Sequence, residues 1–291
     1  MACRGLLPPR RVNEGRGGNR NTNTSSTRTC RMAKRALAAL RGILTGASSG
    51  IGRALAVELI GHGARLVLVA RRREELECLA RELDPTGGHV QIVAGDITDD
   101  AVRQAAIQTV MHHWWGLDLV INNAGIGARS RFVEASPERL RKIMEVNFFA
   151  PTELIRSAIP QLKQGRKPIV VNVGSILGHR GVPRHTDYCA SKFALRGLSE
   201  SLRAELAPMG IDLLLVSPGR TETSFLDHSL ARESVAWDNE PAVTPAYVAR
   251  RVARAIECGR HEIVVNYRGQ LLVWLNRLSP RLLDRILARY G

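Results

Sequence analysis

Thr45-Gly46-Ala47-Ser48-Ser49-Gly50-Ile51-Gly52 joins a short apolar run at 41–45 to a helical pattern at about 51–62. Glycine permits a tight turn and lets backbone amides approach a phosphate closely, and the positive end of the next helix would face that phosphate. The spacing G-x-x-x-G-x-G differs from the common G-x-G-x-x-G, but its place between strand and helix indicates nucleotide binding rather than a flexible connection. The predicted contacts are Gly46, Ser48, Ser49, Gly50, Ile51 and Gly52.

Strand-like and helix-like segments alternate beyond this turn. Aliphatic runs predict strands at 41–45, 64–70, 89–94, 117–121, 168–173, 211–216 and 262–265. Helical patterns lie between them at 51–62, 72–83, 98–113, 136–163, 188–207 and 245–257. Continuous aliphatic strands separated by helices imply a parallel sheet that is covered on both faces. The predicted fold is therefore α/β, a single-domain Rossmann fold with a doubly wound parallel sheet of about seven strands.

Composition narrows the class of protein. The 291 residues are 44% apolar, which is enough for a large aliphatic core, and no run of 18 apolar residues predicts a transmembrane span. The five cysteines show no metal-ligand spacing and no CxxC, so we expect no metal site and a reducing, cytoplasmic setting. The net charge of +15 is concentrated at the ends, with seven Arg and one acid in 1–31 and nine Arg and three acids in 250–291. No nucleic-acid-binding motif accompanies it, so we expect no nucleic-acid partner.

The N-terminal segment 1–36 is basic and rich in Asn, Thr, Ser and Gly, which predicts a disordered extension. The lack of an apolar h-region after the first residues argues against a secretory signal. An organelle transit peptide fits the composition but lacks an amphipathic apolar face. The third interpretation, which we favour, takes Met32 as the natural start of the protein.

The rest of the chain divides into the Rossmann-fold domain at 37–268 and a tail at 269–291. Within the domain, the irregular stretch 224–244 predicts a substrate lid, and its apolar residues favour a hydrophobic substrate over ordinary loop packing. The tail reads as two helices, the second with an apolar stripe beside several arginines. Such a tail can contact a membrane surface peripherally, or it can pack on the body, a partner subunit or the substrate cleft.

The end of the second predicted strand indicates which dinucleotide binds. An acidic residue about 20 positions past the glycines would accept hydrogen bonds from the NAD ribose, whereas an Arg would pair with the 2′-phosphate of NADP. Arg71 follows Ala70 at that place, and no acid occupies it. An Arg at a helix N-terminus is unfavourable to the helix dipole, which a bound anion would explain. The sequence thus predicts NADP(H) rather than NAD(H), with Arg71 reading the phosphate.

Further candidate ligands of the cofactor follow the third and fourth predicted strands. Asp96 and Ile97 follow the third strand, and Asn123-Ala124-Gly125 follows the fourth. Ligands bind at the carboxyl ends of strands in open α/β sheets. Asp96 could accept from the adenine amino group, while a structural role as turn residues is open for Asn122 and Asn123.

Tyr188 and Lys192 are four residues apart, so in a helix they lie on one face. A free phenol titrates near ~10, and a neighbouring cation lowers its pKa. Bringing that pKa to ~7 would require about 4 kcal/mol of differential interaction. Taken alone the pair predicts either an acid–base site or an ordinary surface helix.

Together these motifs resemble the short-chain dehydrogenase/reductase family over about 41–265. The matching residues are the glycine turn, Asp96, Asn122-Asn123-Ala124-Gly125, Asn147, Ser175, Tyr188-x-x-x-Lys192 and Pro218-Gly219, in the family's order. The resemblance implies that Tyr188 exchanges the proton, that Lys192 lowers its pKa and holds the nicotinamide ribose, and that Ser175 bonds the carbonyl oxygen. It implies a water-holding role for Asn147 in the helix 136–163. It also implies nicotinamide contacts for Pro218, Gly219 and either Thr221 or Thr223.

The resemblance implies an NADP(H)-dependent oxidoreductase that acts on a carbonyl or secondary alcohol. Acyl, steroid, retinoid and xenobiotic ketones are the lipophilic substrates considered. Homodimers or homotetramers formed through the long helices are expected, as is common in the family. The alternative is a catalytically silent relative that senses NADPH or acts as a membrane-associated interaction protein, although the four catalytic residues Asn147, Ser175, Tyr188 and Lys192 are intact.

Overall fold

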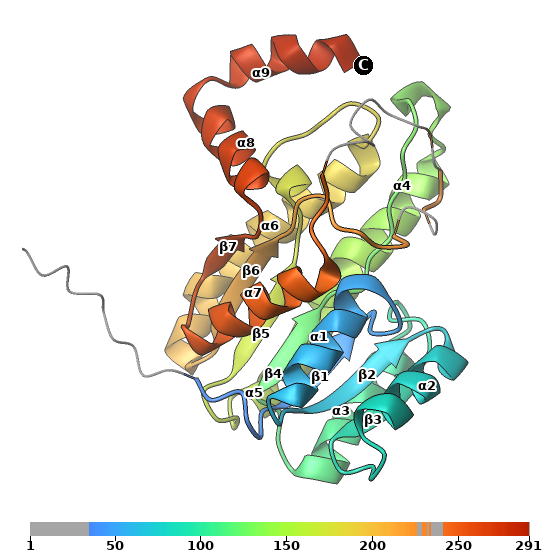
Figure 1. Ribbon diagram of the computed structural model, residues 1–291, viewed down its shortest axis with the longest axis vertical. Helices are drawn as coiled ribbons and strands as arrows, with labels where there is room; N and C mark the ends of the chain where they lie inside the picture. The colour runs from blue at the N-terminus through green and yellow to red at the C-terminus, as the bar shows by residue number, and fades with distance from the viewer. Residues whose placement is uncertain (1–34, 226–228, 232, 234–240, 291) are drawn as a thin grey trace, which may run out of the picture. The chain divides into compact units, whose positions relative to one another are not determined.

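The computed structural model describes residues 35–225, 229–231, 233 and 241–290. Its strands are β1 (Arg41–Thr45), β2 (Arg65–Ala70), β3 (Val90–Ala94), β4 (Leu119–Asn122), β5 (Ile169–Val173), β6 (Asp212–Ser217) and β7 (Glu262–Val264). They pair in parallel in the order β3-β2-β1-β4-β5-β6-β7 (Figure 1). The predicted seven-stranded parallel sheet is confirmed.

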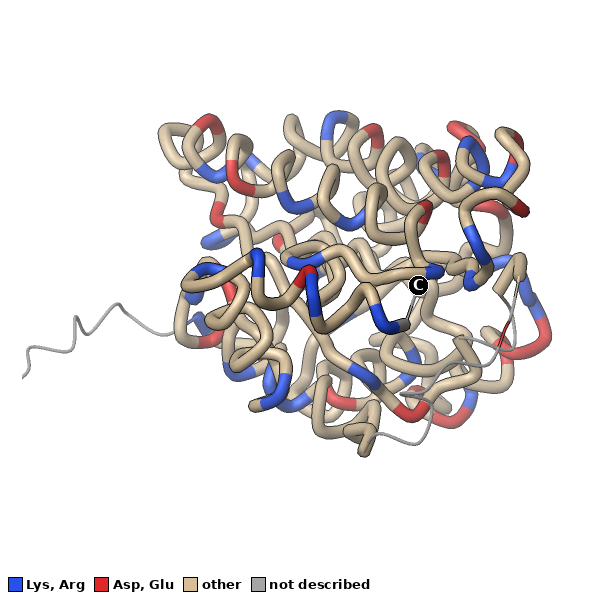
Figure 2. The backbone as a smooth tube through the Cα atoms, turned by 90° about the horizontal axis from the view of Figure 1, so that it is seen from above, with Lys and Arg blue, Asp and Glu red and all other residues tan. Residues whose placement is uncertain are grey.

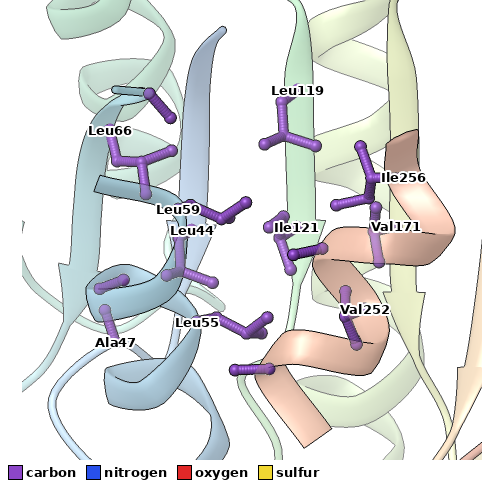
Figure 3. Packing of buried hydrophobic residues seen from close by; sticks show 14 of the residues in the cluster. Leu44, Ala47, Leu55, Leu59, Leu66, Leu119, Ile121, Val171, Val252 and Ile256 are labelled. Carbon is purple, nitrogen blue, oxygen red and sulfur yellow. The ribbon is translucent and has the colours of Figure 1, made fainter. Parts of the chain in front are cut away.

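Helices cover both faces of this sheet, as predicted. The helices of the described chain are α1 (Gly50–Gly61), α2 (Arg73–Leu83), α3 (Asp100–Trp114), α4 (Pro137–Met144), α5 (Ala150–Leu162), α6 (Thr186–Leu206), α7 (Pro245–Glu257), α8 (Tyr267–Leu278) and α9 (Pro280–Leu287), of which α8 and α9 extend beyond the sheet (Figure 1). Side chains alternate between the faces of a strand. Leu44 of β1 accordingly packs in one core cluster with α1, α2 and α7, and its neighbour Ile43 packs in the other with α3 and α5. Figure 3 shows Leu55 of α1 and Val252 of α7 directed at the face of the sheet that bears Leu44.

The sheet order reverses between β1 and β4. From β1 the chain first adds β2 and β3 on one side and then returns to place β4 on the other. In open α/β sheets, ligands bind outside the carboxyl ends of the strands at such a reversal. The glycine turn follows β1 and Asn123 follows β4, so both lie at this point.

The helix predicted over 136–163 forms as one helical run over 137–162, but a π-helical turn that was not predicted lies in its middle. The structure divides it into α4, a π-helical turn at Glu145–Phe149 and α5. Residue 151 is Pro, which has no N–H, so it cannot donate the α-helical bond to the carbonyl of Asn147. Single π-helical turns inside α-helices occur frequently at functional sites, and this one contains Asn147.

The predicted boundary of the N-terminal extension at residue 36 lies too late. Arg35 is buried, and its guanidinium donates to the carbonyl of Ile256 at 2.8 Å and pairs with Asp212 at 2.6 Å. These bonds attach the chain to the body before β1 begins. Met32, the rest of 1–34 and most of the predicted lid lie outside the described residues. Within the described ranges, no helix is long and apolar enough to cross a membrane.

Candidate active site

The turn between β1 and α1 is shaped by glycines. Gly46 and Gly50 have φ of +67° and +54°, values that L side chains rarely adopt. A methyl group at Gly52 would lie 2.1 Å from the carbonyl oxygen of Gly46. Ser49 caps α1 without a side-chain hydrogen bond, and no acid stands in the first turn. Backbone amides at this helix end therefore suit an anion such as a dinucleotide phosphate.

Asn123 braces this turn from the neighbouring strand. Its Nδ2 donates to the carbonyls of Thr45 at 3.0 Å and Gly46 at 3.1 Å. The hydroxyl of Thr45 in turn accepts from the backbone N–H groups of Asn123 and Ala124, both at 3.0 Å. The Asn123 side chain therefore shapes the cofactor turn. Thr45 was not predicted as a site residue, although a hydroxyl-bearing residue at the end of β1 could have indicated a hydrogen bond to the neighbouring turn.

A buried polar chain crosses the sheet behind the site. The amide of Asn122 donates to Asn172 at 2.8 Å, and Asn172 donates to the hydroxyl of Ser199 at 2.9 Å. All three side chains are buried, so the bonds form away from competing water. They join β4, β5 and α6, which supports the structural alternative for Asn122. Sequence reasoning missed Asn172 and Ser199, because nothing local links them.

Arg71 lies exposed immediately after β2. Its two neighbours have partners within the protein, since Arg72 bonds Ser48 at 3.0 Å and pairs with Glu75, and Arg73 pairs with Glu77. Glu74 and Glu75 in the first turn of α2 also favour the helix dipole. Arg72 and Arg73 therefore have acidic partners within the protein. Among the described residues, Arg71 has no recorded ion pair.

Asp96 stands one residue past Gly95, beyond the end of β3. It is exposed, and its Oδ1 accepts from the N–H and hydroxyl of Thr98 at 3.0 and 2.9 Å. These bonds fix the carboxylate while leaving Oδ2 without a recorded bond in the described chain. Ile97 is buried in the core, so only its backbone could contact a cofactor.

Lys192 reaches the carboxyl end of β5. Its Nζ donates to the carbonyl of Val173 at 2.9 Å and lies 5.7 Å from the ring centre of Tyr188. Burial lowers the pKa of Lys192 to about 8. A methyl group at Gly125 would lie 3.7 Å from this Nζ, so the ammonium also borders the turn after β4.

Burial raises the pKa of Tyr188 to about 12, and the hydrogen bond with Ser175 opposes that rise. The expectation that Lys192 would lower this pKa differs from the structure, because burial disfavours the phenolate more than the hydrogen bond with Ser175 favours it. Tyr188 is consequently protonated at neutral pH and can donate a proton. Ser175 accepts from the N–H of Leu177 at 3.1 Å, which orients its hydroxyl.

Asn147 is buried, and both N–H groups of its side-chain amide donate hydrogen bonds. Its Nδ2 donates to the carbonyl of Ile126 and the hydroxyl of Ser191, and its Oδ1 accepts from the N–H of Ile126, all at 2.9 Å. Ser191 also donates to the carbonyl of Tyr188 at 2.8 Å. Asn147 is therefore connected to the start of α6 through Ser191, which sequence reasoning missed. The water relay at Asn147 stays a prediction.

An ion pair secures the residue before Tyr188. Arg139 of α4 contacts the carboxylate of Asp187 at 2.7 Å and donates to the hydroxyl of Ser130 at 2.6 Å. The Asp187 side chain is buried. This pair fixes the first turn of α6 against α4 and was not predicted.

The segment after β6 closes the other side of the site. The carbonyl of Pro218 accepts from the N–H of Ile176 at 3.0 Å, beside Ser175. Thr221 is paired with Val243, whereas Thr223 approaches Gly50, where a methyl group would lie 3.1 Å from it. The structure thus brings Thr223 to the glycine turn.

One residue of the predicted lid covers Tyr188. The rings of Tyr188 and Phe225 meet edge to face with centres 5.7 Å apart. Phe225 also packs against Gly127, where a methyl group would lie 2.8 Å from it. The apolar ring of Phe225 therefore lies against the ring of Tyr188. In the described chain, no group of three or more His, Cys, Asp or Glu could hold a metal ion.

Comparison with known proteins agrees with this arrangement. Residues 42–234 match the family described as short chain dehydrogenase. The chain belongs to the short-chain dehydrogenase/reductase family. It is therefore an oxidoreductase with a Rossmann nucleotide-binding fold.

Individual relatives cover most of the chain. "Dehydrogenase/reductase SDR family member 7" of Homo sapiens is 37% identical over 195 residues, which span 65% of this chain and 58% of that protein. "Dehydrogenase/reductase SDR family member 7B" of Xenopus tropicalis is 31% identical over 84% of each chain. A short-chain dehydrogenase/reductase from Burkholderia phymatum, solved in complex with NAD, superposes with a TM-score of 0.78 at 24% identity, covering 85% of this chain and 96% of that one.

Proposed function

We propose that this protein transfers a hydride between NADP(H) and a carbonyl or secondary alcohol of a lipophilic substrate. One observation carries the proposal. Tyr188 shares a hydrogen bond with Ser175, and its ring centre lies 5.7 Å from Nζ of Lys192, at the sheet edge that also bears the glycine turn. A cytoplasmic location and assembly into homodimers or homotetramers belong to the same proposal.

The glycine turn and the open first turn of α1 fit the phosphates of a dinucleotide. When bound, the nicotinamide would supply or accept the hydride. The side chains transfer the proton and stabilise the charge that develops. In reduction, the phenol of Tyr188 donates its proton to the carbonyl oxygen, and the hydroxyl of Ser175 hydrogen-bonds the same oxygen as charge develops. The positive charge of Lys192 stabilises the phenolate that remains.

Preference for NADP rests on Arg71. Its exposed guanidinium at the end of β2 forms no ion pair with the described residues. Ser48 lies nearby, where its hydroxyl accepts a hydrogen bond from the adjacent Arg72. The Burkholderia phymatum complex contains NAD, so the fold alone does not select NADP. The choice must therefore come from residues such as Arg71.

An Arg71→Ala variant tests this preference, with Arg73→Ala as the matched control on the same turn. Loss of a charged hydrogen bond costs about 1.5–3 kcal/mol, so KM for NADPH should rise roughly 10- to 100-fold while KM for NADH stays unchanged. Arg73→Ala should change neither. Equal use of NADH and NADPH by both variants and the wild type would refute the preference.

The lipophilic substrate is supported by the Phe225 ring packed on Tyr188. An apolar wall beside the reacting hydroxyl favours apolar groups on the substrate. A screen of NADPH oxidation with acyl, steroid, retinoid and simple aromatic ketones, set against sugar-like carbonyls, tests it directly. Higher kcat/KM for the sugar-like group would contradict the proposed substrate class.

A further inference from the structure

The last two helices carry large apolar side chains that the fold leaves exposed. On α8 and α9, the exposed members are Tyr267, Leu271, Trp274, Leu278, Leu282 and Ile286, which we call the terminal apolar row. Trp274 is 58% exposed and Leu278 63%. Single exposed apolar residues are ordinary, but six in one short segment indicate an interaction surface.

The row follows helical geometry. Residues 267, 271, 274 and 278 recur at intervals of four, three and four, which places them on one face of α8. Leu282 and Ile286 are likewise one turn apart on α9. Val273 and Leu283 are buried instead. The helices are thus attached through other residues, and the row is not needed for that attachment.

Specific bonds hold the two helices against the segment that joins Ser175 to Tyr188. Arg180 of that segment donates to Asn276 at 3.1 Å and pairs with Asp284. Asn276 in turn donates to the carbonyl of His179 at 3.0 Å. The terminal apolar row therefore has a fixed position next to the candidate active site.

Arginines accompany the row. Arg277, Arg281, Arg285 and Arg289 are exposed, and Figure 2 marks arginine positions in blue on the backbone near the C-terminus. Asp284 is the sole acid between residues 267 and 290 of the sequence, and it is paired with Arg180. A second copy of the chain would bring like charges together, which is unfavourable at an interface. An anionic lipid surface offers apolar depth and negative charge together.

We propose that the terminal apolar row docks on the surface of an anionic lipid bilayer, with the apolar side chains at the interface and the arginines against the headgroups. The contact is peripheral. It would hold the Ser175–Tyr188 segment close to the membrane surface. The proposal does not depend on the identity of the substrate or on turnover.

Flotation of the full-length protein with phosphatidylcholine vesicles, with and without phosphatidylserine, tests the docking. The wild type should float with the anionic vesicles at low salt, and less at high salt. Each arginine near such a surface contributes about 1 kcal/mol, so combined R281Q, R285Q and R289Q should weaken binding roughly 100-fold. Trp274→Ser with Leu278→Ser should weaken it at least about tenfold.

Matched controls keep the test specific. Trp115→Ser changes a Trp that is 84% exposed at the end of α3, and Arg73→Gln changes an exposed Arg on α2, so neither should alter vesicle binding. Thermal unfolding of each variant shows that the fold is intact. No binding by the wild type, equal binding to neutral vesicles, or a dimer that dissociates in the Trp274→Ser, Leu278→Ser protein without lipid would each overturn the proposal.

Discussion

The glycine turn and the Tyr188 region share one edge of the sheet but are held by opposite means. At the turn, the missing side chains of Gly46, Gly50 and Gly52 let backbone atoms approach one another. Around Tyr188, side chains from several elements hold the backbone in place, since Asn147 hydrogen-bonds Ser191 and Arg139 pairs with Asp187.

This difference separates stability from rate. A side chain added at the turn meets backbone that cannot easily move, so the first effect should be on folding and cofactor binding. Removing the hydroxyl of Tyr188 leaves the packing nearly unchanged, so under the proposed function the first effect should be on turnover. Substitutions in the two regions can therefore be told apart by what they alter.

Tyr188→Phe should give the largest effect on rate. General acid catalysis contributes about 10²–10⁴-fold, so kcat should fall roughly 1,000-fold because no other proton donor replaces the phenol. Binding of NADPH, followed by fluorescence titration, and the melting temperature should stay near wild type. Tyr247→Phe on α7 serves as the matched control and should retain full kcat. A Tyr188→Phe enzyme within a few-fold of wild type would remove Tyr188 from the reaction.

Gly52→Ala should show the opposite behaviour. The added methyl would lie 2.1 Å from the carbonyl oxygen of Gly46 and 2.5 Å from the amide of Asn123. Relieving this overlap must shift backbone, which costs about 3 kcal/mol of unfolding free energy, and should weaken NADPH binding. Urea unfolding measures the first effect and titration the second.

Gly61→Ala is the matched control in the same helix, because nothing lies within 4 Å of a methyl group there. It should change the unfolding free energy by less than about 1 kcal/mol. If the two variants proved equally stable, steric exclusion at the turn would not be what shapes it.

The parts that sequence predicted are those that local chemistry determines. Aliphatic runs gave the strands, and the glycine spacing with its strand–helix context gave the nucleotide turn. The four-residue spacing of Tyr188 and Lys192 placed both on one helix face, as found in α6. Each of these signals is contained within a few residues.

The parts that sequence missed depend on segments distant in the chain. The Asn122–Asn172–Ser199 chain joins three elements, and the partner of Asp187 is 48 residues away. The direction of the pKa shift at Tyr188 also required the structure. Sequence identified Lys192 as a neighbour, but the extent of burial around the phenol is a property of the whole fold.

The buried Lys192 should make activity and stability depend on pH in opposite directions. In the proposed reaction the charged form of Lys192 supports proton donation, and its pKa is about 8, so kcat/KM for reduction should fall about 15-fold between about pH 8 and about pH 9.5. Stability should respond in the other direction. The unfolded lysine titrates near ~10.4, so between about pH 8 and that value the unfolded state binds more protons, and the free energy of unfolding rises with pH by roughly 3 kcal/mol from this group.

Lys192→Met isolates that contribution, since Tyr188 and Cys189, whose pKa values burial raises, titrate in both proteins. The difference in unfolding free energy between wild type and Lys192→Met should therefore shift in favour of the wild type from about pH 7.5 to about pH 9.5. A constant difference would mean that Lys192 does not titrate in this range. Gly52→Ala should lower the whole stability curve without changing its slope against pH, because the added methyl carries no proton. A change of slope in Gly52→Ala would show that the turn and the buried lysine are coupled, and the separation between the two regions would fail.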